Sequence, residues 1–313
     1  MNVEELIKRY EAGERDFSGV DLHGVSIDDE LDGINLSHAN LSHADLDGAS
    51  WKNVNLSHAD LSDSILDHTN ITNANFTEAN LTRMWALQSS LEGSDLSGAN
   101  LSDVHFNDVH LFGANLSGAN LSHAFLSNTY LRGANLSNTN LTGVNLTVVS
   151  GLSEANLSGA NLTAVLYNSC ADFPAEIDLT QWGAIFVDAG ANLSGLDLMN
   201  VRLGGQELNG ANFSRANLSG AQLDSGDLTK TNFSYANLSY AWLGNTKLID
   251  ADLSHANLEG VDLRGTDLSH ANLEEANLSR ANLTYANLKN ANLSNAIFCN
   301  TIMPDGSVRT DNS

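Results

Sequence analysis

Cysteine, proline and long apolar runs are almost absent from this 313-residue chain, which has two cysteines and two prolines. Cys170 and Cys299 lie far apart, so they predict neither a disulfide framework nor a paired-cysteine metal motif, and we interpret both as free thiols. No segment approaches the ~18 consecutive apolar residues of a membrane-spanning helix. The opening residues, Met1 to Glu5, lack the basic start and the apolar run of a secretory signal. We therefore expect a cytoplasmic protein that does not span a membrane.

Basic residues are scarce as well. Lysine and arginine together number 14 against 38 aspartate and glutamate residues, which gives a formal net charge of −24. Because such a chain repels nucleic-acid phosphates, we expect no direct binding of DNA or RNA. The same charge favours a basic protein as partner, or competition with DNA for a basic groove.

A five-residue repeat dominates what is present. Each unit has a large apolar centre, usually leucine, with a small residue two positions before it and Asn or Asp directly before it. The centres recur every five residues from Leu31 to Leu146 and from Leu193 to Met303. This period matches neither an α-helix nor a β-strand. It predicts a unit that turns once in five residues, with turn chemistry supplied by Asn, Asp, Ser and Gly.

One unit inverts the rule of sizes. Ala86 stands where the central leucine belongs, and Met84 takes the position of the small residue. With both side chains pointing inward, the exchange roughly keeps the core volume and needs no functional explanation.

With units such as Ala39-Asn40-Leu41-Ser42-His43, the chain resembles the pentapeptide-repeat proteins, whose motif is A(D/N)LXX. The resemblance covers nearly the whole chain. It implies an all-β fold, a right-handed quadrilateral parallel β-helix in which four units close one coil. Stacked coils would then pair like parallel strands, about 4.8 Å apart.

The two ends depart from the repeat. Residues 1–13 are predicted to form a capping α-helix, because Val3, Leu6, Ile7 and Tyr10 make an apolar stripe at helical spacing. The predicted β-helix spans residues 14–303. Residues 304–313 are predicted to be a flexible tail.

Residues 168–190 also break the pattern, although Ile177, Trp182 and Val187 keep the spacing of five. We number the four faces of a coil so that Leu31 lies on the first face and Leu46 on the fourth. If residues 168–187 form a full coil, all one-residue slips of the repeat fall at the corner between the fourth and first faces. We therefore interpret 168–190 as a degenerate coil, bulged around Cys170–Pro174, with a projecting loop as the alternative.

The position before the centre points outward and is Asn or Asp in most units, but the fourth face departs from this rule. It carries Asp45, Ile65, Trp85, His105, Phe125, Asn145, Leu166 and Phe186. An exposed apolar stripe of this kind usually marks a partner site, so we predict a protein-binding surface here. Its residues are Ile65, Trp85, Leu87, Phe125, Leu166 and Phe186. The alternative is that the stripe packs beneath the N-terminal segment or beneath the bulge. Trp242, with Tyr235 and Tyr240, forms a smaller candidate patch.

No motif for catalysis or cofactor binding stands out. There is no P-loop, and no glycine-rich dinucleotide motif follows a strand. The outward column of His43, Asp63, Arg83, Asp103 and His123 is interpreted as a surface charge ladder rather than a metal site. A leucine-filled solenoid lacks the cleft that catalysis needs. We therefore predict no catalytic residue, no cofactor and no metal, and hence no enzyme.

Both ends of the chain resemble cyanobacterial HetL-type members of the family, regulators of heterocyst differentiation that act by binding another protein. The resemblance rests on Met1 to Phe17 and on Ile302 to Ser307. It implies a rigid, non-enzymatic scaffold for an unidentified protein partner, and we expect a monomer. The alternative is the Qnr and MfpA branch, acidic DNA mimics that inhibit a type II topoisomerase as dimers. The net charge fits that branch, whereas the polar end from Ser307 to Ser313 lacks its apolar dimerisation element.

Overall fold

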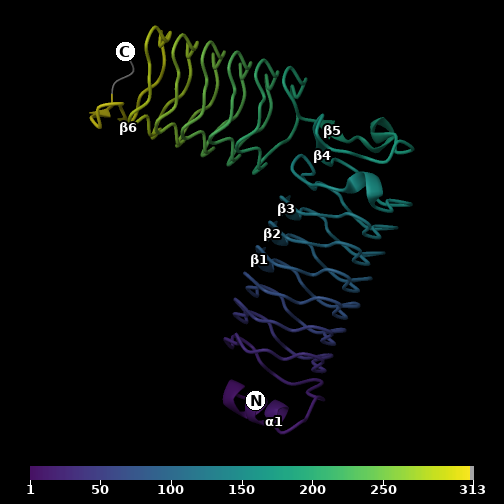
Figure 1. The fold of residues 1–313 in the computed structure, drawn as a ribbon. Helices are drawn as coiled ribbons and strands as arrows, with labels where there is room; N and C mark the ends of the chain where they lie inside the picture. Colours follow the sequence, from purple (N-terminus) through teal and green to yellow (C-terminus); the bar gives the residue numbers. More distant parts are fainter. Residues whose placement is uncertain (311–313) are drawn as a thin grey trace. The chain divides into compact units, whose positions relative to one another are not determined.

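The structure is a computed structural model, and it describes residues 1–310 apart from the side chain of Thr180. Two compact units divide the chain, Met1–Ile185 and Phe186–Ser313, and each has its own stack of coils (Figure 1). Helix is confined to one α-helix and two short 3-10 helices among the described residues. None of the described helices is long and apolar enough to cross a membrane.

Parallel β-bridges link residues one coil apart in the first unit from Asp16 to Leu166. Asn35 pairs with Asn55, and Asn55 pairs with Asn75, so four five-residue units make one coil. Because each side of a coil is extended for only two or three residues, most pairings are single bridges. The fourth face holds the longest strands, β1 (Trp85–Leu87), β2 (His105–Asn107) and β3 (Phe125–Ser127), which form a parallel three-stranded sheet.

The repeat centres fill the interior of the coils. Leu41 and Leu121 are buried, and so is the small residue Ala39 that precedes one of them. Met84 and Ala86 are both buried, which confirms that this unit exchanges its large and small side chains inside the core. Burial of the leucines is the main favourable term for this fold, at about 25 cal/mol per Å² of apolar surface.

Most corners are tight turns closed by one backbone hydrogen bond. At a representative corner, the N–H of Ala39 donates to the carbonyl of Leu36 at 3.1 Å. His38 then adopts a φ of 57°, the left-handed region that only some residues enter readily. Gly, Asn and Asp are well suited to that conformation, which explains their frequency two positions after the centre.

Asparagine side chains form ladders along the stack. The Nδ2 of Asn55 donates to the Oδ1 of Asn35 at 2.9 Å, and the Nδ2 of Asn75 donates to the Oδ1 of Asn55 at 3.1 Å. The Oδ1 of Asn55 also accepts from the backbone N–H of Ser57. The position before the centre therefore favours Asn or Asp because its oxygen serves both the corner and the next coil.

The helix α1 (Val3–Glu11) covers the first coil. Its N-cap is Asn2, whose side chain accepts from the N–H of Glu5 at 2.8 Å. Leu6 is fully buried, and Ile7 and Tyr10 pack against the same core. The helix thereby shields the apolar interior that the first coil would otherwise expose.

The segment predicted as a degenerate coil departs from the ladder. It contains η2 (Leu179–Trp182), a 3-10 helix, and follows η1 (Leu152–Glu154) and β4 (Leu166–Tyr167). At β5 (Ile185–Phe186) the ladder resumes, where the N–H of Ile185 donates to the carbonyl of Val165 at 2.8 Å.

The expected centres Ile177 and Trp182 are not core residues. Ile177 is half-buried, and Trp182 is 38% exposed. The spacing of five persists here without the backbone pairing, because the 3-10 helix occupies the residues that would have formed a side of the coil. On the first face, the Asp172 carboxylate instead accepts from the N–H of Leu152 and the hydroxyl of Ser153.

The second unit repeats the parallel pairing, with Asn212 bridged to Asn232. Its chain ends in a hairpin of β6 (Thr301–Ile302) and antiparallel β7 (Val308–Arg309). This corrects the expected flexible tail at residues 304–310, while 311–313 lie outside the described residues. The hairpin turn is stabilised by Asp305, whose carboxylate accepts from the N–H and the hydroxyl of Ser307.

Candidate protein-binding surface

The outward column of the fourth face in the first unit brings four of its residues into one continuous strip. We call Ile65, Trp85, His105 and Phe125 the aromatic column. They are one coil apart in register, because Ile65 pairs with Trp85 and β1 to β3 pair Trp85, His105 and Phe125 in turn. Side chains alternate along an extended chain, so each points outward while the buried centre beside it points inward.

Ring stacking holds the column together. The Trp85 and His105 rings lie parallel, with centroids 4.0 Å apart and planes 4° apart. The His105 and Phe125 centroids are 6.2 Å apart and tilted. Aromatic pairs of this kind stabilise by about 0.5–1.5 kcal/mol beyond their burial. The rings therefore take over the column position that asparagine ladders fill on other faces.

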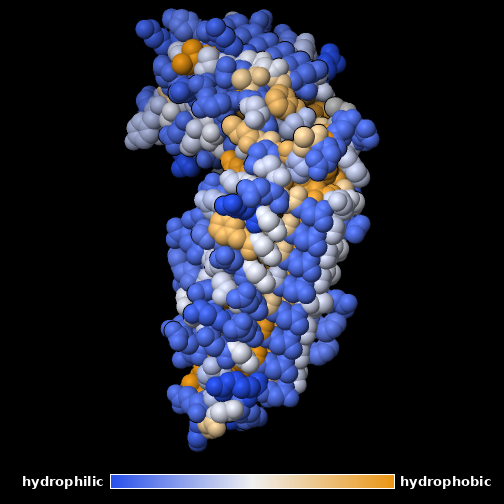
Figure 2. All heavy atoms as spheres, turned by 45° about the vertical axis from the view of Figure 1, so that its right-hand side comes forward, coloured by the Kyte–Doolittle hydropathy of each residue, from blue (hydrophilic) through white to orange (hydrophobic). Residues whose placement is uncertain are grey.

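The column stays accessible. Trp85 is 53% exposed and Ile65 is 40% exposed, while His105, Phe125 and the neighbouring Leu87 are half-buried. On the face drawn in Figure 2, apolar residues gather in limited patches between hydrophilic ones. Single exposed apolar residues are ordinary on proteins, but a contiguous row is less so.

The surroundings of the column are mainly acidic. Asp63 forms two hydrogen bonds with Arg83, at 2.7 Å from Nε and 2.6 Å from the other guanidinium nitrogen. The hydrogen bonding from Arg83 lowers the pKa of Asp63 from its ordinary value. His68 lies 2.9 Å from Asp47, and the hydrogen bond with that carboxylate raises the pKa of His68. The hydrogen bonds from Arg83 therefore keep the Asp63 carboxylate charged at neutral pH.

Two predicted members do not join this surface. Leu166 is only 5% exposed, so it is buried within the first unit instead of being open to a partner. Phe186 is 42% exposed but belongs to the second unit. The predicted set that lies together and open is therefore Ile65, Trp85, Leu87 and Phe125.

An aromatic cluster on the first face is not among the residues predicted from the sequence. Its three members are His110, Phe112 and Tyr130, whose ring centroids lie between 4.9 and 5.8 Å apart. His110 and Tyr130 occupy the position before the centre one coil apart, as Trp85 and His105 do on the fourth face. The same column rule therefore finds His110 and Tyr130, whereas Phe112 follows the centre Leu111 and lies outside the rule.

The smaller patch expected in the second unit is also exposed. Trp242 is 57% exposed, and the ring of Tyr235 stacks on His255 with centroids 4.5 Å apart. The guanidinium of Arg215 lies over the ring of Tyr235, 5.4 Å from its centroid. This patch is a matched surface against which changes in the aromatic column can be compared.

The predicted charge ladder on the neighbouring corner is present as contacts between His43, Asp63 and Arg83. Within residues 1–310, no three His, Cys, Asp or Glu side chains are placed to hold one metal ion. Both cysteines are exposed and free. The distinctive surface chemistry of the first unit is therefore its aromatic rings and their acidic neighbours.

The family follows from the repeat itself. The family model described as pentapeptide repeats (8 copies) matches the chain at six stretches, residues 34–73, 74–111, 110–147, 197–234, 231–269 and 262–300. These matches cover more than half of the chain, so it belongs to the pentapeptide-repeat family. Proteins of this family adopt a right-handed quadrilateral β-helix, with which the parallel four-sided coils agree.

Solved structures of the family resemble the chain at low similarity. HetL, a pentapeptide repeat protein involved in heterocyst differentiation regulation from the cyanobacterium Nostoc sp. strain PCC 7120, is 28% identical over 99% of this chain and 100% of its own, with a TM-score of 0.23. A pentapeptide repeat protein of the Arabidopsis thaliana thylakoid lumen is 28% identical over 37% of this chain and 71% of its own, with a TM-score of 0.27. Full-length QnrB1, a plasmid-mediated fluoroquinolone resistance protein, is 18% identical over 79% of this chain and 93% of its own, with a TM-score of 0.24. No curated protein sequence matches the chain.

Proposed function

We propose that this chain is a non-enzymatic scaffold that binds a protein partner through the aromatic column and Leu87. The observation that supports the proposal best is the replacement of ladder-forming residues by Ile65, Trp85 and Phe125 on one face in one register. Large aromatic side chains in a contiguous accessible row are the residues that dominate binding energy at protein interfaces. The solenoid supplies rigidity, since each coil is fixed by its neighbours.

The acidic surroundings of the column shape the expected partner. Asp63 and Asp67 lie two residues either side of Ile65, and Asp45 and Asp47 lie one coil earlier, while the whole chain has a net charge of −24. A basic surface would be drawn to this face and would associate faster at low salt. We therefore propose a basic protein as the partner.

A double variant tests the proposal. Trp85→Asp with Phe125→Asp should abolish capture of the partner from a lysate of the native host, because both changes place charge in the apolar row. The matched control is Trp242→Asp, which alters an equally exposed tryptophan of the second unit. Circular dichroism and the melting temperature check that the coils remain folded. Unchanged capture by a folded double variant would rule out this surface.

A second candidate function is inhibition of a type II topoisomerase by an acidic mimic of DNA. The net charge of −24 supports it, because such a surface can compete with DNA for a basic groove. A supercoiling assay with DNA gyrase at micromolar protein should show inhibition that weakens as salt increases. Full supercoiling activity at that concentration would remove this candidate and leave the first one standing.

A further inference from the structure

The coil before η2 presents an unpaired backbone edge. The carbonyls of Ala155 and Ala160 and the N–H groups of Leu157, Gly159 and Leu162 form no hydrogen bond within the described part of the chain. One coil earlier, the five corresponding groups are all bonded. They are the carbonyls of Ala134 and Thr139 and the N–H groups of Leu136, Asn138 and Leu141, at 2.8 to 3.0 Å from residues 156–161. The backbone of this coil therefore has the geometry of the paired coils, but no strand of the described residues pairs with this edge.

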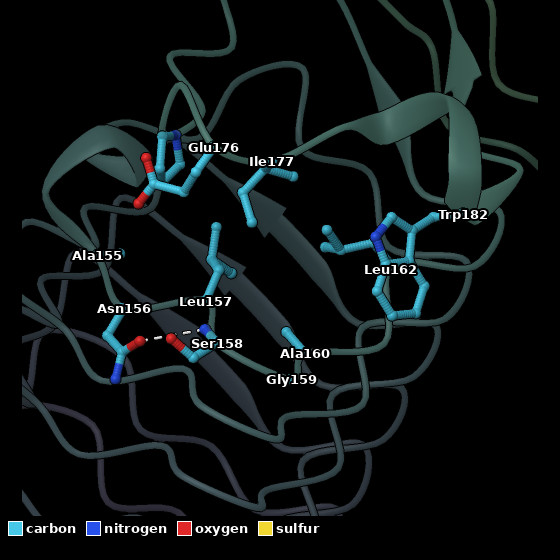
Figure 3. A pocket seen from close by; sticks show the side chains of 11 residues that line it. Ala155, Asn156, Leu157, Ser158, Gly159, Ala160, Leu162, Glu176, Ile177 and Trp182 are labelled. Carbon is cyan, nitrogen blue, oxygen red and sulfur yellow. Dashed lines mark hydrogen bonds between the residues drawn. The ribbon is translucent and has the colours of Figure 1, made fainter.

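A cavity of about 230 Å³ runs along this edge. Figure 3 shows Ile177 above Leu157, Trp182 beside Leu162, and Glu176 on the side of Ala155. The cavity is lined by Ala155, Asn156, Leu157, Ser158, Gly159, Ala160, Leu162, Pro174, Glu176, Ile177 and Trp182. All of these residues lie in the first unit. The covering segment therefore shields the leucines of the coil but leaves room beside their backbone.

We propose that this edge binds a short extended peptide, which adds to Ala155–Gly159 as a parallel strand. Three peptide residues suffice, because residues 156–158 make the corresponding hydrogen bonds to residues 134–138 of the preceding coil. The first residue would donate its N–H to the carbonyl of Ala155 and accept from Leu157, and the third would accept from Gly159. Strand addition of this kind takes its affinity from main-chain hydrogen bonds and its specificity from alternate side chains.

The walls define the peptide's side chains. Residues 156–158 pair with the preceding coil in the way proposed for the peptide, and the side chain of their middle residue, Leu157, is buried. The middle side chain of the peptide must therefore be small, because Ile177 already covers that position. The first and third side chains point outward, like those of Asn156 and Ser158. Since Glu176 is an exposed carboxylate at the Ala155 end, the first residue should be basic.

Nuclear magnetic resonance with a defined probe tests strand addition. The probe is N-acetyl-Ser-Lys-Ala-Ser-Ser-amide, titrated to millimolar concentration into the full chain. We expect the amide signals of Leu157 and Gly159 to shift, and their hydrogen exchange to slow at least several-fold in saturating peptide. The same peptide with an N-methyl group on lysine loses the donor to Ala155 and should bind at least tenfold more weakly. Absence of shifts at these amides, or equal binding of the methylated peptide, would overturn the proposal.

A charge variant tests the basic first residue. Glu176→Gln should weaken binding of the lysine probe several-fold and leave a probe with alanine in place of lysine unaffected. Glu207→Gln in the second unit is the matched control, with unchanged binding expected. The Glu176→Gln variant should therefore bind the lysine and alanine probes with equal affinity. If that variant still prefers the lysine probe, Glu176 does not recognise the basic first residue. Changes in the aromatic column leave this cavity intact, so failure of the proposed partner surface would not affect the outcome.

Discussion

Single residues at the corners and centres decide how well each coil closes. His38 adopts the left-handed conformation at its corner although it is not a glycine, and its N–H donates to the carbonyl of Ser57 in the next coil at 2.9 Å. The centres contribute through burial, and each contacts mainly its own coil and the adjacent ones. Effects of substitution should therefore depend on how far a residue lies from the end of its stack.

A leucine in the middle of the first unit gives the clearest measure of this dependence. Leu121→Ala should lower the free energy of unfolding by about 2–5 kcal/mol in urea titrations, because it leaves a cavity in a packed interior. Leu46→Ala, nearer the N-terminal end, should lose amide protection mainly in the first coils. Equal loss of protection throughout the first unit for both variants would contradict nearest-neighbour coupling.

The His68 and Asp47 pair predicts a pH effect. Because the hydrogen bond with Asp47 raises the pKa of His68, Asp47→Asn should lower that pKa towards its ordinary value in a titration of the imidazole signals. The folded pKa is the higher one, so the stabilisation is fully present below the unfolded value, about 6.5, and is lost as pH rises through the folded pKa. Asp47→Asn should therefore destabilise the protein more at pH 5 than at pH 9. A larger destabilisation at pH 9 than at pH 5 would show that the charged His68–Asp47 pair does not stabilise the fold.

At the scale of elements, β1 shows how a strand tolerates an irregular unit. Met84 and Ala86 are both buried, so their volumes compensate within one side of a coil. Met84→Ala alone should cost about 2–5 kcal/mol. Ala86→Leu alone should cost about 1–3 kcal/mol through overpacking. The double variant restores the regular unit, and its cost should be well below the sum in a double-mutant cycle. Simple additivity would mean that the two side chains do not share space.

Much of the element structure was predictable because one rule repeats. The five-residue period locates the centres, and the exchange at Met84 and Ala86 followed from size alone. The interrupted coil was less predictable, because Ile177 and Trp182 keep the period while the backbone forms a 3-10 helix. Spacing reports which side chains recur, but it does not report whether the main chain pairs. The hairpin of β6 and β7 was missed for a similar reason, since its strands are only two residues long.

The candidate site was predictable where the register is uniform. Twenty-residue bridges place Ile65, Trp85 and Phe125 in one column, so counting along the sequence found them. Leu166 continues the column across a one-residue slip, since it pairs with Asn145, but its side chain is buried. The coverage of a surface depends on tertiary packing, which the repeat does not encode.

At the scale of the whole molecule, the chain consists of two compact units, and the irregular segment lies at the end of the first. A region with few backbone hydrogen bonds opens at low cost. Limited digestion with a glutamate-specific protease should therefore cut first at Glu176, apart from cuts within α1. Mass spectrometry of the early fragments identifies the site. An earlier cut at Glu92 or Glu259, which lie in paired coils, would show that the segment is as well protected as the ladders.

The asparagine ladders restrict where this protein can be made for such experiments. Asn-Leu-Ser triplets such as those at Asn35 and Asn55 are acceptor sequences for N-linked glycans. The glycan attaches to Nδ2, the same nitrogen through which Asn55 donates to Asn35. Passage through a eukaryotic secretory pathway would thus place bulky sugars on the atoms that join successive coils. Production in a bacterial cytoplasm or a glycosylation-free cell extract keeps those nitrogens available for the fold.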